Sequence, residues 1–241
     1  MEPVSDLRHQ TFHRPFPLPD KPWKYYQEWH DVLFCHWKVK AEKIAALLPD
    51  SVTLDTFEGD AWVSMVSFAV KNLRMRYFPP FTPVSDFNEV NLRTYVVKDD
   101  KPGIYFFSIE ADKMLSVLFS RSLIGIRYKK ADIRKKLNEH LVTNPDQKHF
   151  YLAQFLPLEK MSSRSALDLW LTERYVLYQK QGNRLYRYHI HHIEWPLKNV
   201  KIKNMTIYYR KGGLIRENES PARAHYAPEL QVLTWGREKC D

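Results

Sequence analysis

An acid, an amide, a base and a phenol alternate along one extended stretch near the middle of the chain. Residues 87–96 read FNEVNLRTYV, and polar and apolar side chains alternate along them as they do in a strand. Because successive side chains of a strand point to opposite faces, one face carries Glu89, Asn91, Arg93 and Tyr95. A carboxylate enclosed by a barrel must be paired or protonated, since an isolated buried charge is very costly. This face is therefore a candidate polar site, with Glu89 as its acid/base or hydrogen-bonding group.

The same row of side chains also has a purely structural interpretation. Arg93 lies two pleats from Glu89, and the two could form an internal ion pair that only stabilises the fold. In the functional interpretation, Arg93 pairs with an anionic ligand, while Asn91 and Tyr95 complete the binding set. The residues alone leave both interpretations open.

A dense basic run lies further along the chain. Residues 127–136 read RYKKADIRKK and contain six basic side chains. Neighbouring ammonium groups in a dry pocket lower each other's pKa, so Lys129 or Lys130 could serve as a catalytic amine. Such runs are more often solvated surface, which is the competing interpretation.

Histidines near residue 190 are candidate metal ligands. His189 and His191 would project from one face of a strand, and Glu173 lies on the strand before it. Two histidines and a carboxylate can bind zinc or iron. Because no further cluster has ligand-like spacing, we favour packed or surface histidines and expect no metal and no cofactor.

Several other residues are candidates for supporting the site. Glu173, Arg174 and Tyr178 are expected to form a hydrogen-bonded and ion-paired cluster, with a role beneath the cavity as the functional alternative. We place His192 in the same supporting group. His36, next to a tryptophan on a strand-like stretch, could line or close the pocket.

The charge balance permits several kinds of partner without selecting one. The chain of 241 residues has 37 basic and 28 acidic side chains, a net charge of +9. A basic, aromatic surface for nucleic acid could form from Lys198, Lys201, Lys203, Arg210 and Lys211 with Tyr208 and Tyr209. No nucleic-acid motif is recognisable, so we expect a small-molecule ligand and no specific nucleic-acid partner. Assembly into a homo-oligomer is left open.

Cysteine content and hydropathy bear on the compartment. Cys35 and Cys240 form neither a disulfide framework nor a zinc pattern. The first residues contain no apolar signal segment, and no apolar run approaches the ~20 residues of a membrane span. We therefore expect a cytoplasmic protein with no membrane association.

Turn signals and periodicity divide the chain into a proline-rich arm, residues 1–22, and one domain, residues 23–241. Many short strands and few helices predict a mainly antiparallel sheet or barrel with covering helices. Helical segments are predicted at 23–29, 40–48, 111–124 and 165–172. Strands are predicted at 30–39, 52–57, 61–76, 87–96, 104–109, 150–156, 173–178, 184–193, 198–209 and 231–235, and 131–142 could be either.

Six stretches together resemble the YqjF-like family of uncharacterised bacterial proteins. They span roughly residues 30 to 235 and read LFCHWKV from 33, LDTFEGDAWV from 54, FNEVNLRTYV from 87, KPGIYFFSIEA from 101, LTERYVLY from 171 and HIEWPL from 192. That family is similar in fold to acetoacetate decarboxylase. The resemblance implies a β-rich, cone-like double barrel with a central cavity.

The resemblance also implies a comparison of catalytic groups. Acetoacetate decarboxylase uses a Schiff-base lysine from a Gly-x-Pro-Lys-Lys motif. Matching the glycine to Gly125 puts Tyr128 at the Schiff-base position and Lys129 at the second lysine. A one-residue shift instead pairs Lys129 and Lys130 with the two lysines. Glu89 matches the cavity glutamate of the decarboxylases on a comparable strand.

These observations lead to one functional hypothesis with two versions. We expect an enclosed polar and aromatic cavity that binds a small anionic or oxygenated molecule, with Tyr128 as a wall and hydrogen-bond donor. In one version the protein is a decarboxylase-like lyase that uses Glu89 and Lys129. In the other it binds the molecule without catalysis.

Overall fold

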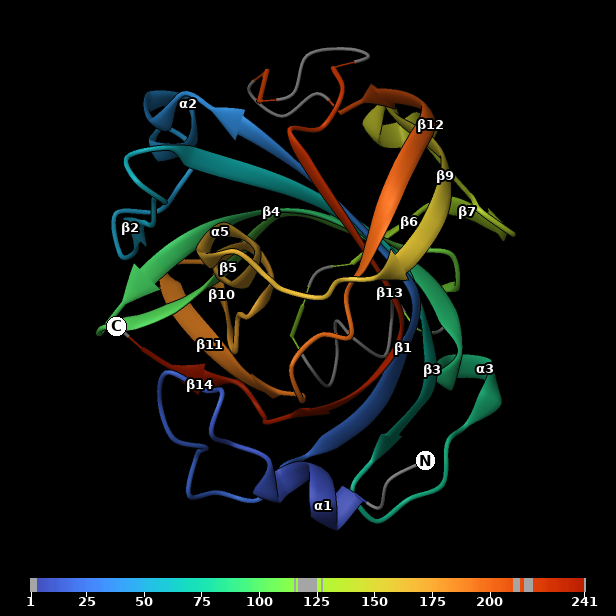
Figure 1. The fold of residues 1–241 in the computed structure, drawn as a ribbon. Helices are drawn as coiled ribbons and strands as arrows, with labels where there is room; N and C mark the ends of the chain where they lie inside the picture. Colours follow the sequence, from blue (N-terminus) through green and yellow to red (C-terminus); the bar gives the residue numbers. More distant parts are fainter. Residues whose placement is uncertain are drawn as a thin grey trace.

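Strands dominate the architecture of the protein (Figure 1). The computed structural model describes residues 4–114, 116, 125–126, 128–209, 213–214 and 219–240. These residues form one 14-stranded, mainly antiparallel sheet, and a few short helices lie around it. The mainly β fold predicted from the alternating pattern is confirmed.

Seven strands of this sheet close into a ring. Each strand pairs with the next along the order β11-β10-β5-β4-β3-β1-β13, and β11 also pairs with β13. The ring is uneven, because the parallel β5–β10 pairing and the closing β11–β13 pairing each join only two residue pairs. Its members are β1 (Tyr25–Val39), β3 (Ala61–Met75), β4 (Phe87–Lys98), β5 (Lys101–Ala111), β10 (Val176–Gln181), β11 (Arg184–His191) and β13 (Arg223–Thr234).

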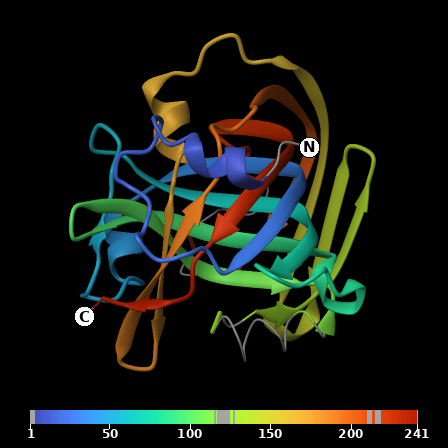
Figure 2. The ribbon, with the colours of Figure 1, turned by 90° about the horizontal axis from the view of Figure 1, so that it is seen from below.

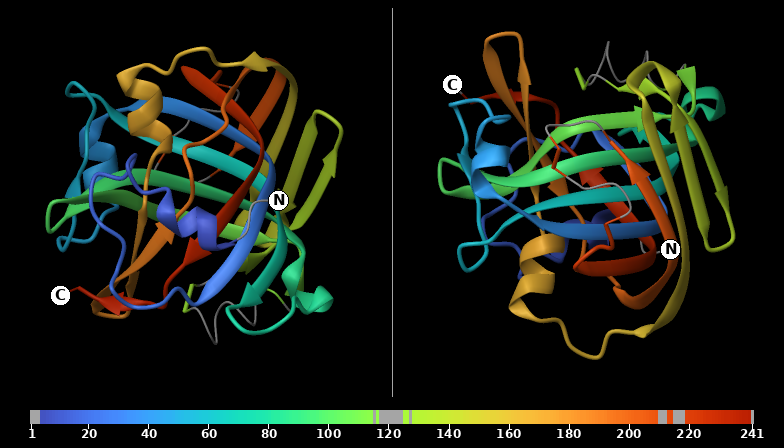
Figure 3. Two further views of the ribbon diagram at one scale, coloured as in Figure 1. Left: turned by 60° about the horizontal axis from the view of Figure 1, so that its bottom comes forward. Right: turned by 90° about the horizontal axis from the view of Figure 1, so that it is seen from above.

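The sheet continues from β13 into a second layer. Four strands follow in the order β12 (Lys198–Tyr208), β9 (His149–Lys160), β8 (Glu139–Asn144) and β7 (Asp132–Lys136). Short strands complete the sheet: β2 (Thr53–Leu54) pairs with β4, β6 (Lys129–Lys130) with β5, and β14 (Glu238–Lys239) with β11. The β7–β8 hairpin stands at one side of the molecule, as Figures 2 and 3 show.

Three neighbouring strands, β1, β3 and β4, are shared by two hydrophobic cores. On β1, Val32 and Phe34 pack into the first core, while Leu33 and Cys35 pack into the second. The first core fills the ring, and the second lies between these strands and the β7–β9 layer. Since apolar side chains leave both faces of these strands, the strands are fixed from both sides. They therefore form a rigid support for polar side chains placed among them.

The helices that the structure describes from end to end are short and lie outside the ring. They are α1 (Val4–His9), α2 (Ala41–Ala45), α3 (Thr82–Ser85) and α5 (Ala166–Thr172), with a 3-10 turn at Pro145–Gln147. Ser165 caps α5 by a reciprocal pair of hydrogen bonds with Asp168. Among the helices that the structure describes, none is long and apolar enough to span a membrane.

A glycine permits the close approach of β5 and β10. A Cβ atom on Gly103 would lie 2.5 Å from the Val176 carbonyl oxygen and 2.8 Å from the Tyr178 ring. The hydroxyl of Tyr178 donates to the carbonyl oxygens of Lys98 and Lys101, both at 3.0 Å, and so holds the β4–β5 turn. Tyr178 thus stabilises the hairpin that carries the polar face.

The prediction of a helical segment at 23–29 is wrong. Residues 25–29 are not a helical turn but the start of β1, because their aromatic rings pack while their backbone pairs with β3 and β13. The arm does contain a helix, α1, which precedes the prolines at 15–22 and buries Leu7. The arm is also tied to the ring, since Arg14 donates to the Ile190 carbonyl oxygen at 2.8 Å.

Other differences concern element boundaries. The ambiguous segment 131–142 is the β7–β8 hairpin, with Asn138 at a φ of 61° in its turn. The strand predicted at 231–235 is the end of β13, which starts at Arg223, and the strand predicted at 52–57 is shortened to Thr53–Leu54. Of the helix predicted at 111–124, Ala111 belongs to β5 and Met114 and Ser116 are helical, whereas residues 115 and 117–124 lie outside the described residues.

Candidate functional site

An internal cavity of about 90 Å³ lies inside the ring. Most of its lining is apolar or aromatic. Its polar lining residues are Gln27, Glu89, Asn91, Arg93 and Thr234, together with the tyrosines Tyr25, Tyr128 and Tyr188. A water needs roughly 10–15 Å³ of such space, so the cavity has room for a molecule of about six non-hydrogen atoms. An apolar pocket with a few convergent polar groups is the usual form of a small-molecule site.

Glu89 is the acid of this cavity. Its side chain is almost fully buried, and Tyr128 and Asn91 donate hydrogen bonds to its two oxygens at 2.7 and 3.0 Å. Burial raises the pKa of Glu89 to about 7, although both hydrogen bonds and the charge of Arg93 act in the opposite direction. The carboxyl group therefore changes its protonation state near neutral pH, as a proton-exchanging group must.

Arg93 is the cation of the cavity, and it has no carboxylate partner among the residues that the structure describes. Its guanidinium carbon lies 5.4 Å from the centroid of the Phe34 ring, and its side chain interacts with the Tyr95 hydroxyl. No ion pair joins it to a carboxylate of the described residues, and its Nε is buried without a hydrogen-bond partner. The internal Glu89–Arg93 ion pair considered from the sequence is therefore not formed. A buried, unsatisfied cationic donor is costly unless something else pairs with it.

Tyr95 leads from Arg93 into a chain of buried hydrogen bonds, which we call the Asp168 network. The Tyr95 and Ser64 hydroxyls are 2.5 Å apart, and Ser64 Oγ lies 2.6 Å from His36 Nδ1. His36 Nε2 lies 3.1 Å from His225 Nδ1, and His225 Nε2 lies 2.8 Å from Asp168 Oδ1. His36 therefore lies behind the cavity wall, and its expected role as a lining residue is replaced by a supporting position.

Asp168 is the acceptor at the end of these hydrogen bonds. Burial alone would raise the pKa of Asp168, but hydrogen bonds from His225, Arg223 and Ser165 outweigh it and hold the pKa well below its usual range. An ionised carboxylate can only accept, so His225 donates to it from Nε2. Burial, and after it the charge of His225, hold the pKa of His36 well below its ordinary value, so His36 is neutral and one of its two ring nitrogens accepts.

Ser64 in this network is not placed as a nucleophile. Its hydroxyl is close to a histidine that connects to an aspartate, which resembles a catalytic triad in residue type. However, Ser64 has no exposed surface and does not line the cavity. The network is better described as a support that fixes Tyr95 against Arg93.

Lys129 does not reach the cavity. It lies on β6, its side chain is exposed, and its Nζ hydrogen-bonds to Gln147. Lys130 is also exposed, and its Nζ donates to the Ala131 carbonyl oxygen at 3.0 Å. The prediction of Lys129 as a catalytic amine inside the cavity is therefore wrong, because its side chain points to solvent. Tyr128, one residue earlier, does line the cavity.

The predicted supporting residues lie in different places. Glu173 accepts from Arg164 at 2.6 Å and from the backbone amide of Trp195 at 3.0 Å. The His192 ring packs 5.2 Å from Trp195, which lines the cavity, so both residues hold that wall. Arg174 pairs with Asp55 at 2.6 Å and its guanidinium carbon lies 5.0 Å from the centroid of the Tyr95 ring. Tyr178 does not support the cavity. It lies away from it and hydrogen-bonds to the β4–β5 turn.

The three side chains considered as metal ligands, those of His189, His191 and Glu173, have separate partners. His189 faces Glu238 at 3.4 Å, and His191 Nε2 lies 2.7 Å from the Leu7 carbonyl oxygen of the arm. Glu173 is engaged with Arg164. Within the part of the chain that the structure describes, no three potential metal-binding side chains gather. Of the proposed nucleic-acid residues, Arg210 and Lys211 lie outside the described residues.

A second buried acid, Glu110, was missed from the sequence. It lies in the second core, where Asn144 and His149 hydrogen-bond to Oε1 at 2.9 and 2.7 Å and Tyr209 donates to Oε2 at 2.8 Å. Both oxygens are thus occupied, and Glu110 does not line the cavity. The alternation of Glu110 with Ile109 on β5 could have indicated a buried acid, but its hydrogen-bond partners lie far away in the sequence.

Sequence analysis also missed most of the Asp168 network. Asp168 and Ser165 have the S-x-x-D spacing of a helix cap, which could have been noticed. Ser64, His225 and Arg223 carried no local signal, because they meet only when β3, β13 and α5 are brought together.

Solved structures similar to this one define the class of fold. The acetoacetate decarboxylase of Legionella pneumophila superposes with a TM-score of 0.59 and 13% identity, over 100% of this chain and 96% of that chain. "Enduracididine biosynthesis enzyme MppR complexed with pyruvate" superposes with a TM-score of 0.62 and 9% identity, over 94% of this chain and 93% of that chain. The protein has an acetoacetate-decarboxylase-like fold, as the resemblance implied.

Sequence comparison then defines the family. The model of the DUF2071 family, described as "Uncharacterized conserved protein (COG2071)", matches residues 26–231. "Uncharacterized protein YqjF" of Bacillus subtilis (strain 168) is 38% identical over 229 residues, which cover 92% of this chain and 95% of that protein. The chain belongs to this YqjF-like DUF2071 family.

The raised pKa of Glu89 predicts a pH-dependent stability. Between its ordinary value of 4.5 and about 7, the folded protein holds a proton that the unfolded chain releases, so the free energy of unfolding falls as pH rises. A shift of this size corresponds to about 3 kcal/mol. Glu89→Gln keeps a hydrogen-bond acceptor but does not titrate, so urea unfolding should show the variant gaining stability relative to the native protein from pH 5 to pH 8.

The exposed Glu42 on α2 provides the matched control. Glu42→Gln should change the free energy of unfolding by less than about 0.5 kcal/mol. A stability difference between Glu89→Gln and the native protein that stays constant from pH 5 to pH 8 would contradict the raised pKa. Failure of Glu89→Gln to fold at every pH would make Glu89 a structural residue.

The Asp168 network makes a separate prediction. Asp168→Asn removes the charge that pairs with Arg223 at 2.7 Å and replaces one of the two oxygens that accept from Arg223, His225 and Ser165 by an amide donor, so chemical denaturation at pH 7 should show a loss of about 2–3 kcal/mol. Because the pKa of Asp168 is depressed, the native protein exceeds Asp168→Asn most in free energy of unfolding above the ordinary pKa of an aspartate. This difference is lost as pH falls further.

The exposed Asp132–Arg134 pair, at 2.8 Å, is the control. Asp132→Asn should cost less than about 0.5 kcal/mol, and equal losses in the two variants would contradict a special role for the network.

Proposed function

We propose that the cavity binds a small organic acid that carries a carbonyl or hydroxyl oxygen next to its carboxylate. Arg93 pairs with the carboxylate, and Glu89 exchanges a proton with the bound molecule. The observation that carries this proposal is the buried Arg93 guanidinium, which has no carboxylate partner among the described residues and shares its cavity with an acid titrating near pH 7.

The charge of the cavity favours an anion. When Glu89 is protonated, Arg93 is the only charged group in the cavity lining that the structure describes. Removing a guanidinium from water costs several kcal/mol unless an anion compensates it. A ligand carboxylate supplies that anion and can accept the Nε–H, which otherwise has no acceptor. Binding therefore removes an unfavourable feature of the empty cavity.

Glu89 and Tyr128 suit the other end of such a ligand. A protonated Glu89 has one O–H donor, while Tyr128 and Asn91 already donate to its oxygens. Burial and the neighbouring Glu89 raise the pKa of Tyr128 well above its ordinary value, so its hydroxyl stays a neutral donor. The carboxyl proton is then available to a ligand oxygen. A 2-oxo acid of about six non-hydrogen atoms matches both the volume and these groups, and the fold neighbour MppR is described in complex with pyruvate.

A purely binding role is the second candidate, and the position of Lys129 favours it over Schiff-base chemistry. Schiff-base catalysis requires an amine in the cavity, but no lysine is among the described lining residues. Catalysis through Glu89 needs no amine. As a base, the carboxylate can take a proton from the carbon next to the ligand carbonyl and return it from the solvent pool.

Isothermal titration with pyruvate tests the binding step. The native protein should bind pyruvate at pH 6, and the affinity should fall as pH rises through about 7, because Glu89 then becomes an anion. Arg93→Gln should weaken binding at least about tenfold, the loss expected for one charge-assisted hydrogen bond. Lys129→Ala should leave the affinity unchanged, since Lys129 lies outside the cavity.

Proton exchange separates an enzyme from a binding protein. In deuterated water, proton NMR should show the pyruvate methyl signal disappearing faster with native protein than with Glu89→Gln. Binding without faster exchange would leave a binding protein. Equal pyruvate affinities for the native protein and Arg93→Gln would contradict the proposed anion site.

A further inference from the structure

An aromatic loop without charged side chains connects β3 to α3. Residues 77–81 read Tyr-Phe-Pro-Pro-Phe, all five are exposed, and no charged residue occurs from 77 to 85. Tyr77 is 83% exposed, Phe78 is 59% exposed and Phe81 is 66% exposed, although rings of this size are usually buried. None of the three rings belongs to a hydrophobic core of the described residues. The loop therefore presents apolar surface to the solvent.

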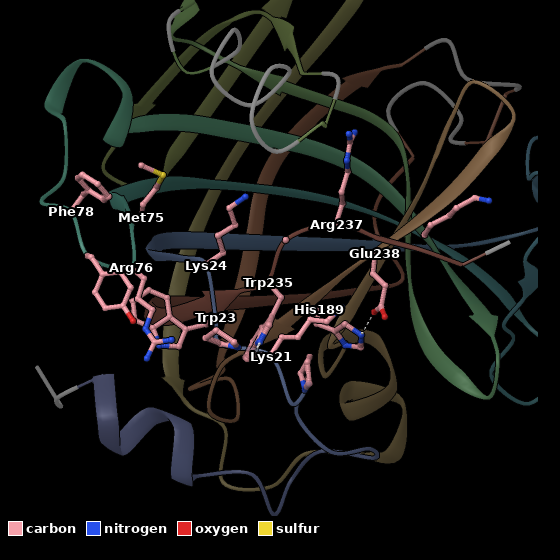
Figure 4. A pocket seen from close by; sticks show the side chains of 15 residues that line it. Lys21, Trp23, Lys24, Met75, Arg76, Phe78, His189, Trp235, Arg237 and Glu238 are labelled. Carbon is pink, nitrogen blue, oxygen red and sulfur yellow. Dashed lines mark hydrogen bonds and ion pairs between the residues drawn. The ribbon is translucent and has the colours of Figure 1, made fainter.

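Hydrogen bonds at both ends hold this loop in place. The Phe78 amide donates to the Met75 carbonyl oxygen at 3.0 Å, and the Ser85 amide donates to the Phe81 carbonyl oxygen at 2.8 Å. Two prolines between these turns restrict the backbone further. In Figure 4, Phe78 lies close to Met75 and Arg76 at one end of the open cleft that the figure shows. Because the rings are already held outward, little conformational entropy is lost when they bind a surface.

A basic side chain lies at each end of the loop. The guanidinium carbon of Arg76 is 5.1 Å from the centroid of the Tyr77 ring and 5.3 Å from that of Trp23. At the other end, Lys113 Nζ donates to the Thr82 carbonyl oxygen at 3.4 Å. Among the described residues, neither cation forms an ion pair with a carboxylate. Both positive charges are thus available to an external anion.

The wider surroundings of the loop are also net positive. Lys24 is exposed, and its carbonyl oxygen accepts from the Arg76 amide at 3.0 Å. Of the two acids nearest in sequence, Asp86 contacts Lys71 at 3.5 Å, while Asp112 accepts two hydrogen bonds from β4 at 2.7 and 2.8 Å. The cations are spread around the rings and do not converge on one point. This arrangement suits an extended anionic surface better than a single phosphate group.

We propose that this loop inserts into the headgroup region of an anionic lipid membrane, so that the protein binds at the membrane surface. The three rings enter the interface, and Arg76 and Lys113 contact lipid phosphates. Aromatic rings next to basic side chains are the usual composition of an interfacial anchor. The expectation of no membrane association came from the absence of an apolar span, and binding at a surface needs no such span.

A second protein surface is the competing occupant, and the exposed area disfavours it. The three rings together expose roughly 400 Å², if a fully exposed ring of this kind offers about 200 Å². A stable protein interface needs about 800 Å² from each partner. Anionic lipids instead add attraction for every basic side chain near the surface. None of residues 77–81 lines the internal cavity, so this inference does not depend on the proposed acid site.

Flotation with lipid vesicles tests the inference. The native protein should bind vesicles of equal parts phosphatidylcholine and phosphatidylglycerol, bind phosphatidylcholine alone much more weakly, and lose affinity as salt rises. Phe78→Ser should weaken binding to the mixed vesicles at least about tenfold, because the inserted ring no longer leaves water. Phe78→Trp should keep the native affinity, since tryptophan suits the interface. Arg76→Gln should weaken binding about fivefold.

Two matched controls change exposed side chains elsewhere. Phe12→Ser removes a ring that is 86% exposed on the N-terminal arm, and Lys201→Gln removes a charge on the exposed face of β12. Both should leave vesicle binding unchanged, while all variants keep the native melting temperature. Phe81→Ser should repeat the tenfold loss and keeps the test informative if Phe78→Ser fails to fold.

Three results would overturn the inference. The first is no binding of the native protein to the mixed vesicles. The second is a loss in Phe12→Ser or Lys201→Gln equal to that in Phe78→Ser, which would show general stickiness or charge attraction. The third is a dimer in analytical ultracentrifugation that Phe78→Ser abolishes, which would assign the loop to a second copy of the chain.

Discussion

The structure depends on how two ionisable groups share one buried cavity without neutralising each other. Glu89 and Arg93 lie on the same face of β4, yet they form no ion pair. Burial raises the pKa of Glu89 to about 7, so Glu89 stays protonated and uncharged below that pH. Arg93 cannot release its proton at that pH and keeps an unsatisfied Nε–H. A cavity with this imbalance favours an anion, and the proposed function follows from that preference.

The surrounding fold is rigid, and it holds the unpaired Arg93 and the protonated Glu89 in place. Because β1, β3 and β4 carry apolar side chains into two cores, the polar row on β4 cannot move away from the cavity. Behind it, the Asp168 network connects α5 and β13 to Tyr95 through two histidines and Ser64. The ionised aspartate at its end accepts from His225 and Arg223. The network thus fixes the hydroxyl that Arg93 contacts.

Alternation along a strand was enough to place Glu89, Asn91 and Arg93 in one row, because that relation is local. It also predicted the mainly β fold. The same reasoning could not find His225, the partner of His36, which lies 189 positions away in sequence, or Asp168, which bonds to His225 and lies 132 positions from His36. They meet only through β13 and α5. Lys129 was misplaced because a motif comparison does not show to which side of β5 the short strand β6 attaches. The aromatic start of β1 resembled a helical turn until its pairing on both sides was known.

The most direct test of the account is the ionisation of Glu89 itself. Carbon-13 NMR of the side-chain carboxyl, assigned by the signal that Glu89→Gln loses, gives the midpoint of its titration. The account predicts a midpoint near pH 7 in the free protein, moving higher when pyruvate saturates the cavity, because a bound anion disfavours a second negative charge. A midpoint near the ordinary value of 4.5, unchanged by pyruvate, would contradict it.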